Sequence, residues 1–435
     1  MKHLAIKNMP SSTTTGLTFV DLCAGCGGLS LGLFQAGWRG LFAVEKDDDA
    51  FKTLAHNLLG DQPQRFQWPS WLPKTSHSLE EMTTKYAEQL KAQRGKVDLL
   101  AGGPPCQGFS TIGRRKAHDP RNQLFRQYLK VVDLLQPKMV LMENVRGIMC
   151  PFKGDDAPRD SHGKPLIYAQ IIKDSLGADY HVWSDIVQAK DFGVPQTRPR
   201  FILIGLRKKS PHEVKPDSEP FAILNRKRFS FLAAKGLGPA HTTVQEAISD
   251  LTKKTGQLQD CPETPRFKQG TYGKQASSYQ QLMHGYLNGA LADSHRFAKH
   301  KKETEEAFEY YLDHCKRGKK LDQSERGPYA NKKHTIYILD PKLPAPTVTT
   351  LPDDIIHYSE PRILTVREMA RLQSFPDTFQ FKGKYTTGGD RRTKECPRYT
   401  QVGNAVPPLL AEALGTALMR FLAETPAHGH RAPHS

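Results

Sequence analysis

Residues 18–28 read TFVDLCAGCGG and carry most of the information about the fold. The first five, TFVDL, predict a short buried strand, and the glycine-rich turn after them leads into a stretch with Leu29 and Leu33 on one helix face. Gly37 is suited to end that helix. The stretch therefore predicts a strand, a tight turn and a helix in immediate succession.

The same rhythm continues along the first half of the chain. Apolar strands are predicted at 41–44, 97–101 and 139–142, and helical spacing is found at 51–60 and 124–135. Short apolar strands that alternate with helices are typical of a parallel sheet with helices on both faces. We therefore expect an α/β fold with a doubly wound, mostly parallel sheet.

The pattern changes in the second half. Two strands are predicted at 181–189 and 200–206, joined by a turn at 192–195. The periodicity is then weak over 207–361, where basic clusters such as 226–228 appear.

Helical periodicity returns toward the end of the chain. Thr365 and Glu368 have the spacing of a capping box, and an amphipathic helix is expected from about Pro407. We expect a catalytic domain of residues 1–206 completed by 400–424, a second domain with its return connection at 207–399, and a disordered tail at 425–435.

Composition narrows the class of protein. The 435 residues carry 62 Lys and Arg against 45 Asp and Glu, a net charge of +17, which favours a polyanionic partner and nucleic acid first. Seven scattered cysteines form no disulfide framework and indicate a reducing compartment such as the cytoplasm. No signal core and no run of about 18 apolar residues is found, which argues against secreted, membrane-spanning and fibrous proteins.

The turn at 21–28 is suited to a nucleoside-bearing cofactor. Its glycines allow the backbone to approach a ligand at a helix N-terminus, and Glu45 follows the second strand, where a carboxylate can accept hydrogen bonds from ribose hydroxyls. Ser30 replaces the third glycine of the dinucleotide fingerprint, which disfavours NAD and an oxidoreductase. A tight turn without ligand is the alternative. A metal or redox role for Cys23 and Cys26 is disfavoured, because no second pair stands at zinc spacing.

Residues 102–110, GGPPCQGFS, place Cys106 after the strand at 97–101. α/β folds build their sites at the carboxyl ends of parallel strands, and a thiol there can act as a nucleophile. Glu143 ends the next strand and should lie beside Cys106, where it could act as an acid or recognise a ring nitrogen. A buried structural cysteine and a helix-capping glutamate are the alternatives.

Two later segments add polar groups. Arg198 and Arg200 stand at alternate positions of an extended segment, and either could hold a pyrimidine carbonyl or a phosphate, unless they mark a solvated strand end. Asn404 precedes the last helix and could meet a cofactor, although an ordinary helix entry with proline in its first turn explains the segment equally well.

Four segments in this order resemble the DNA (cytosine-5) methyltransferases of the bacterial modification type: PPCQ at 104–107, ENV at 143–145, QTRPR at 196–200 and GNAV at 403–406. The resemblance covers residues 18–206 and 361–422. It implies a Rossmann-like fold that uses S-adenosylmethionine, with a smaller target-recognition domain. One departure is Cys23, where the family often has a phenylalanine.

The resemblance also implies a reaction and a site. A methyl group would pass from S-adenosylmethionine to C5 of a flipped-out cytosine in double-stranded DNA, through a covalent bond between Cys106 and C6. Glu143 would act at N3 and Arg198 at O2, with Arg200 as a further catalytic residue. The cofactor-binding residues would be Asp21, Cys23, Ala24, Gly25, Gly27, Gly28, Glu45, Pro104, Leu124, Asn404 and Ala405. The DNA contacts would be Gln107, Ser110, Arg114, Arg115 and Gln196. No metal is expected.

Other readings share parts of this pattern. A tRNA cytosine-5 methyltransferase has the same core segments, but the large basic block at 207–361 favours DNA and would read the target sequence. A non-catalytic DNA-binding relative is disfavoured by the presence of Cys106, Glu143 and Arg198. We expect a monomer without membrane association, and a cognate restriction endonuclease acting on the same DNA site is a further partner to consider.

Overall fold

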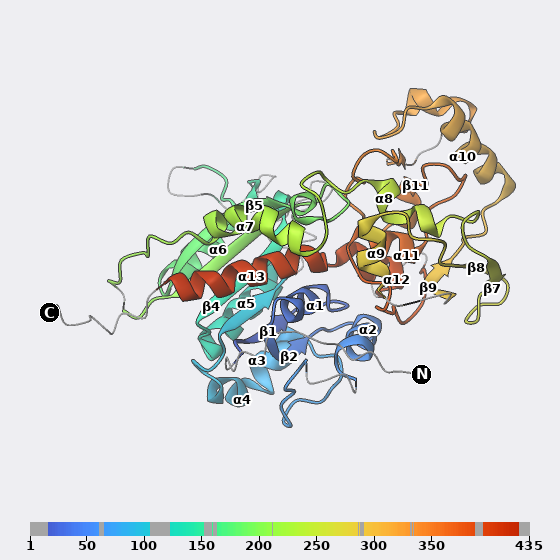
Figure 1. The fold of residues 1–435 in the computed structure, drawn as a ribbon. Coiled ribbons are helices and arrows are strands. Elements are labelled where there is room, and N and C mark those ends of the chain that lie inside the picture. The colour runs from blue at the N-terminus through green and yellow to red at the C-terminus, as the bar shows by residue number, and fades with distance from the viewer. Residues whose placement is uncertain are drawn as a thin grey trace.

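The strand predicted at 18–22 lies within a six-stranded sheet (Figure 1). The computed structural model describes residues 16–60, 65–104, 122–151, 159, 163–210, 212–285, 287, 291–330, 333, 335–387 and 395–425. The strands of the sheet are β1 (Thr18–Leu22), β2 (Arg39–Val44), β3 (Leu99–Gly102), β4 (Met139–Val145), β5 (Tyr180–Gln188) and β6 (Pro199–Arg207). Their order is β2-β1-β3-β4-β6-β5. The first four are parallel, and β6 is antiparallel to both β4 and β5. The mostly parallel sheet is therefore confirmed.

Helices cover both faces of this sheet and form the large lobe of the molecule. They are α1 (Gly28–Gln35), α2 (Asp48–Leu58), α3 (Leu79–Thr84), α4 (Ala87–Ala92), α5 (Asn122–Leu135) and α6 (Tyr168–Gly177), with short 3-10 helices at Arg146–Met149 and Ala189–Phe192. Alternate residues of β1 point to opposite faces, so Phe19 belongs to the core cluster that includes Leu33 of α1, and Val20 belongs to the one that includes Tyr128 of α5. Burial on both faces explains why the strands read as continuous apolar runs.

Two helices from the second half of the chain also belong to the large lobe. α7 (Pro220–Ala234) and α13 (Pro408–Glu424) lie together across it (Figure 1). Lys235, just after α7, pairs with Glu412 of α13 at 2.5 Å. Helix α7 therefore packs in the large lobe although it belongs to the range 207–399 that we expected to form the second domain, and α13 packs beside it. The domain boundaries themselves stay a prediction.

The remaining elements form a smaller lobe beside the sheet (Figure 1). They are α8 (Val244–Ile248), β7 (Leu258–Asp260), β8 (Lys268–Thr271), α9 (Ser278–His284), β9 (Leu291–Arg296), α10 (Lys302–His314), β10 (Tyr337–Ile338), β11 (Ile355–Ile356), α11 (Val366–Leu372) and α12 (Arg398–Asn404), with 3-10 helices at Ser249–Leu251, Gln323–Tyr329 and Pro352–Asp354. Strands β7, β8 and β9 form an antiparallel sheet, and β10 pairs in parallel with β11.

Helix α11 lies at the centre of the small lobe and is held by buried charges. The predicted capping box is present, since the Thr365 hydroxyl accepts from the Glu368 amide and the Glu368 carboxylate accepts from the Thr365 amide. Arg371 donates to both Asp250 and Asp377, and its charge holds the pKa of Asp377 well below the usual range despite burial. These ion pairs hold α11 in place and with it Gln373, the residue that follows the helix.

One helical stretch among the described residues, Arg398–Glu424, is long and apolar enough by composition to cross a membrane, but 78% of its apolar window is buried in the protein, as in a core helix.

Candidate active site

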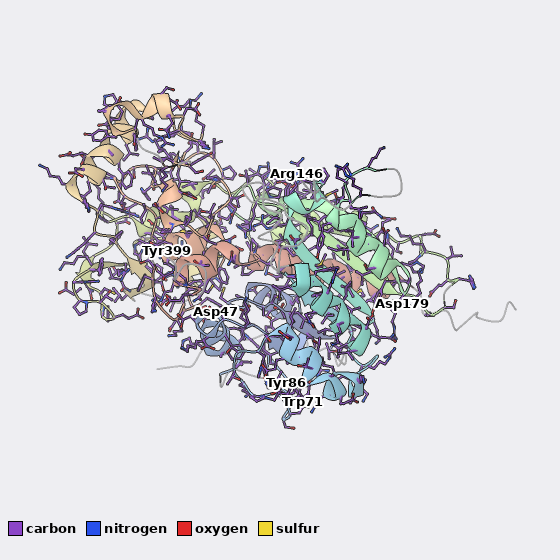
Figure 2. All side chains as sticks on the ribbon, turned by 180° about the vertical axis from the view of Figure 1, so that it is seen from behind. Asp47, Trp71, Tyr86, Arg146, Asp179 and Tyr399 are labelled. Carbon is purple, nitrogen blue, oxygen red and sulfur yellow. The ribbon has the colours of Figure 1, made fainter. Side chains whose placement is uncertain are left out.

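The carboxyl ends of the parallel strands lie at the end of the sheet that faces the small lobe. Figure 2 shows Arg146, which follows β4, at this end, and Asp179, which precedes β5, at the opposite end. The turns after β1, β2, β3 and β4 therefore gather at one edge, as expected for a ligand site in an α/β fold.

The turn between β1 and α1 has the backbone that its sequence predicts. Cys23, Gly25 and Gly27 all have positive φ, at 56°, 56° and 95°. The amide of Ala24 donates to the carbonyl of Val44 at 3.0 Å, which holds the turn against the end of β2. Among the described residues, no atom lies within 4 Å of a Cβ built on Gly25, so within that part of the chain this side of the turn borders open space.

Glu45 reaches into this turn. One carboxylate oxygen accepts from the amide of Gly25 at 2.9 Å, and the other accepts from the amide of Asp47 at 2.8 Å. Burial raises the pKa of Glu45, although the two amide hydrogen bonds act in the opposite direction. The carboxylate thus lies beside the open space at Gly25.

Ser30 stands where the dinucleotide fingerprint has its third glycine, and its side chain has a structural role. Its hydroxyl donates to Oδ2 of Asp21 at 2.6 Å, and Asp21 is fully buried, with no partner for Oδ1 in the part of the chain that the structure describes. Burial raises the pKa of Asp21 to about 7. A glycine at position 30 would remove the only side-chain donor that this carboxyl group has among the described residues.

The two cysteines of the turn have weakly acidic thiols. Burial raises the pKa of Cys26 to about 12, and its sulfur lies 3.7 Å from the carbonyl of Gln401. Burial also raises the pKa of Cys23, and the charge of Glu45 adds to this effect. Neither environment favours a thiolate. Among the described residues, no group of three His, Cys, Asp or Glu side chains is placed to hold a metal ion.

Glu143 and Arg200 form a nearly buried ion pair at the end of β4. Nε of Arg200 lies 2.7 Å from Oε1 of Glu143, and antiparallel pairing of β6 with β4 places Arg200 opposite Val145. A Cβ built on Gly103 would be 3.3 Å from Oε2 of Glu143, so the carboxylate reaches the segment that follows β3. The structure therefore brings Glu143 and Arg200 together beside Gly103, three residues before Cys106 in the sequence.

Asn144 holds Pro104, which follows β3. Its Nδ2 donates to the carbonyl of Pro104 at 3.1 Å, and its Oδ1 accepts from the amide of Val145. We did not single out Asn144 from the sequence, although its place next to Glu143 at a strand end was a usable signal. The hydrogen bond joins the ends of the neighbouring strands β3 and β4.

Arg198 does not share the environment of Arg200. Its Nη1 donates to the carbonyl of Val348 at 3.1 Å, and its Nη2 donates to the carbonyls of Gly403 and Ala405 at 2.9 and 3.0 Å. Burial lowers the pKa of this guanidinium, and the charge of Arg200 adds to the effect. The structure therefore places Arg200 beside Glu143 and turns the donors of Arg198 toward the C-terminal segment, which differs from the expected contact of Arg198 with a ring oxygen.

Gln196 also lies elsewhere than expected. It was predicted to contact DNA, but it is fully buried. Its Nε2 donates to the carbonyl of Leu372 and to Oε1 of Gln373, both at 2.7 Å, while its Oε1 accepts from the amide of Val348 at 2.9 Å. A side chain with both polar atoms engaged in the interior has none left for DNA. The sequence around Gln373 offered no local signal for this pairing.

The C-terminal segment closes the site from the side of the small lobe. Asn404, the last residue of α12, is exposed, whereas Ala405 and Val406 after it are buried. A Cβ on Gly28 would be 2.4 Å from the carbonyl oxygen of Val406, so the two backbones touch. Asn404 is thus the exposed side chain of a segment packed on the glycine turn.

Helix α2 forms a second contact with the small lobe. The hydroxyl of Thr53 donates to Oε1 of Gln401 at 2.7 Å and accepts from the amide of Lys382 at 2.9 Å. Nδ2 of Asn57 donates to the carbonyl of Gln380 at 2.8 Å. The helix that follows Glu45 is therefore fixed to α12 and the loop before it.

Of the other predicted site residues, Ala24 and Pro104 are buried and Leu124 lies partly buried in the first turn of α5. Five predicted residues lie outside the described part of the chain: Cys106, Gln107, Ser110, Arg114 and Arg115.

Comparison with known proteins identifies similar chains. A family model described as C-5 cytosine-specific DNA methylase matches residues 17–420. The type II methyltransferase M.DdeI of Desulfomicrobium norvegicum is 33% identical, with 92% of this chain and 87% of that protein covered. The type II methyltransferase M1.HphI of Haemophilus parahaemolyticus is 30% identical, with 93% and 87% covered. In fold, the chain resembles the crystal structure of a prophage-encoded DNA modification methyltransferase from E. coli, with a TM-score of 0.62, 24% identity, and 94% and 100% of the two chains covered.

Proposed function

We propose, from the premise that this chain belongs to the C-5 cytosine-specific DNA methylases, that it methylates C5 of a cytosine within a specific double-stranded DNA sequence. The observation that carries the proposal is the Glu143–Arg200 pair at the carboxyl end of β4, beside the strand that leads to Cys106. At this edge, Glu143 can act as an acid and Arg200 as a cation toward a cytosine ring that reacts with the thiol of Cys106.

Cys106 would make the cytosine reactive. C5 of cytosine is a poor nucleophile, but addition of the Cys106 thiolate to C6 gives an enamine whose C5 can attack an electrophilic methyl group. The ring cannot be reached inside a duplex, so the target base must flip out, at a cost of a few kcal/mol.

Glu143 and Arg200 would hold the ring during this addition. Glu143 places a proton at N3 and so neutralises the charge that develops on the ring. Arg200, and not Arg198, would bind the ring carbonyl O2, because only Arg200 has its guanidinium against Glu143. After methylation, water removes the C5 proton, and the sulfur of Cys106 leaves with the electron pair of the C6–S bond.

The residues around the glycine turn fit the cofactor of this family. S-adenosylmethionine, when bound, would supply the electrophilic methyl group. The open space beside Gly25 would admit a ligand against the backbone, and the Glu45 carboxylate would accept hydrogen bonds from ribose hydroxyls. Asn404 would contribute an exposed amide from the opposite side.

DNA would lie against both lobes. The net charge of +17 supports binding to phosphates, and Gln107, Ser110, Arg114 and Arg115 remain proposed contacts in the loop after Cys106. We assign target recognition to the small lobe from Thr243 onward, since α7 packs against α13 of the large lobe.

The covalent step can be tested with duplex DNA that carries 5-fluorocytosine at the target. Fluorine cannot leave C5 as a cation, so the enzyme should remain bound to the methylated base in a form that survives denaturing electrophoresis. The target is found first by bisulfite sequencing of DNA from cells that express the protein.

The adduct should require S-adenosylmethionine, be absent from Cys106→Ala and persist in Cys150→Ala. Glu143→Gln should still bind DNA but form the adduct about 100-fold more slowly or worse, since N3 loses its proton donor. An enzyme that methylates DNA without forming an adduct, or that stays active after Cys106→Ala, would refute the mechanism. Methylation of tRNA but not of DNA would refute the substrate.

A further inference from the structure

Arg198 is almost completely buried and is not paired with a carboxylate. It is 2% exposed, and among the residues that the structure describes no acidic side chain lies within ion-pair distance of it. A buried cation is costly unless its hydrogen bonds are satisfied. Three backbone carbonyls accept hydrogen bonds from Nη1 and Nη2, whereas Nε has no partner among the described residues, so the hydrogen bonds that this side chain makes are all to backbone.

The carbonyls that it holds surround one exposed residue. Nη2 donates to the carbonyl oxygens of both Gly403 and Ala405, the residues on either side of Asn404. Nη1 donates to Val348, which adjoins the same segment. Movement of the backbone around Asn404 would break two hydrogen bonds to a charged donor.

Close packing restricts the same segment on two further sides. A Cβ on Gly403 would lie 2.4 Å from the carbonyl oxygen of Thr349, and a Cβ on Gly28 would lie 2.4 Å from that of Val406. Residues 403–406 therefore lie between the glycine turn and the backbone at 348–350, with the guanidinium of Arg198 bound to their carbonyls.

A parallel set of hydrogen bonds supports the end of α12. Nε2 of Gln373 donates to the carbonyl of Val402 at 2.6 Å, and its Oε1 accepts from Gln196. Nε2 of Gln373 also donates to the carbonyl of Ala405 at 3.3 Å, which Arg198 shares. Since Gln373 would keep these bonds, a conservative change at Arg198 should loosen the segment around Asn404 without releasing it.

We propose that Arg198 is a positioning residue that holds the backbone around Asn404 against the glycine turn. It thereby determines the affinity for the cofactor, while Arg200 binds the target cytosine. This rests on the proposed function, because it takes Asn404 to face S-adenosylmethionine. The two arginines, separated by Pro199, thereby divide their roles between the two substrates of one reaction.

Arg198→Lys tests this division. Lysine keeps the charge but cannot bridge three carbonyls with a planar fork. Binding of S-adenosylhomocysteine, measured by calorimetry, should weaken about tenfold, as expected for the loss of hydrogen bonds from a charged donor. The KM for S-adenosylmethionine should rise by about the same factor. Affinity for target DNA and kcat should stay within about threefold, because Arg200 is unchanged.

Arg326→Lys is the matched control. Arg326 is also a buried arginine that donates to backbone carbonyls, those of Leu321 and Lys333, but it lies in the small lobe away from the site. Its substitution should lower thermal stability and leave S-adenosylhomocysteine affinity unchanged. Equal weakening of cofactor binding by both variants would mean general loosening of the fold and would overturn the proposal.

A double-mutant cycle of Arg198→Lys with Asn404→Ala tests whether Arg198 acts on the cofactor through Asn404 or through the general packing of the fold. If Arg198 acts through Asn404, the two substitutions together should weaken S-adenosylhomocysteine binding by clearly less than the product of their separate effects. Independent effects would overturn the proposal, as would an Asn404→Ala variant or an Arg198→Lys variant with wild-type affinity. If instead the wild-type protein binds no S-adenosylhomocysteine and methylates no DNA, the proposed function itself fails.

Discussion

Replacement of Asp21 by asparagine should remove a pH dependence from the stability of the fold. Asp21 is fully buried, with one carboxylate oxygen bonded to the Ser30 hydroxyl and the other without a partner. Burial raises its pKa from 3.8 to about 7; the Ser30 hydrogen bond opposes this shift and the charge of Glu45 adds to it.

The size of the effect follows from proton linkage. Because the pKa is higher in the folded state, the folded protein keeps a proton that the unfolded chain releases. This stabilisation is fully present below pH 3.8 and is lost as the pH rises through about 7. The free energy of unfolding should fall by about 2 kcal/mol between pH 5 and 7 from this group alone, and by about 4 kcal/mol over the whole range.

Urea denaturation of both proteins at pH 4, 5, 6, 7 and 8 measures this contribution. Asparagine does not ionise, so the stability of wild type relative to Asp21→Asn should decrease by about 2 kcal/mol from pH 5 to 7. Asp185→Asn, which changes an exposed aspartate on β5, should leave the profile parallel to that of wild type. Parallel profiles for wild type and Asp21→Asn from pH 4 to 8 would refute the reasoning.

Three further changes test other parts of the site. Glu45→Ala should weaken S-adenosylhomocysteine binding about tenfold or more in calorimetry, whereas Glu88→Ala, which removes an exposed glutamate of α4, should not; equal affinities would exclude Glu45 from the cofactor site. Gly28→Ala should lower the free energy of unfolding by about 1–3 kcal/mol in urea, because its Cβ would press on the Val406 carbonyl, while Gly177→Ala has free space and should be tolerated. Exchange of residues 243–361 for the matching block of a relative should change the sequence found by bisulfite sequencing; an unchanged target would place recognition elsewhere.

Local patterns in the sequence predicted the elements of the large lobe well. The strand at 18–22 was placed with its observed bounds, because its residues are buried on both faces of the sheet and the turn after it is marked by glycines. The capping box at Thr365 and the helix of residues 408–424 were also predicted from local signals, the spacing of Thr365 and Glu368 and the apolar period of the last helix. Helices α3, α4, α6 and α7 of the large lobe were missed. For α7 the reason is that tertiary packing and not a strong local period maintains it.

The roles within the site were less predictable. Glu143 could be placed at the end of one predicted strand and Arg200 at the start of another, but nothing near residue 198 distinguishes Arg198 from Arg200. The difference arises because Arg198 meets carbonyls 150 and 205 residues away, and Gln196 meets a side chain 177 residues away. Contacts of that separation depend on how α12 and α13 return to the sheet.

The packing of the C-terminal helix α13 against α1 has a consequence for the synthesis of the protein. Val406 and the start of α13 pack against the first turns of α1, and nearly the whole small lobe is translated between them. A nascent chain on the ribosome therefore leaves the apolar face of α1 uncovered until residues 405–424 have emerged. The packing of residues 405–408 against the glycine turn and α1 forms only at that stage, so chains released before this point should not modify DNA. Because α13 is translated last, only chains that extend through α13 should methylate DNA.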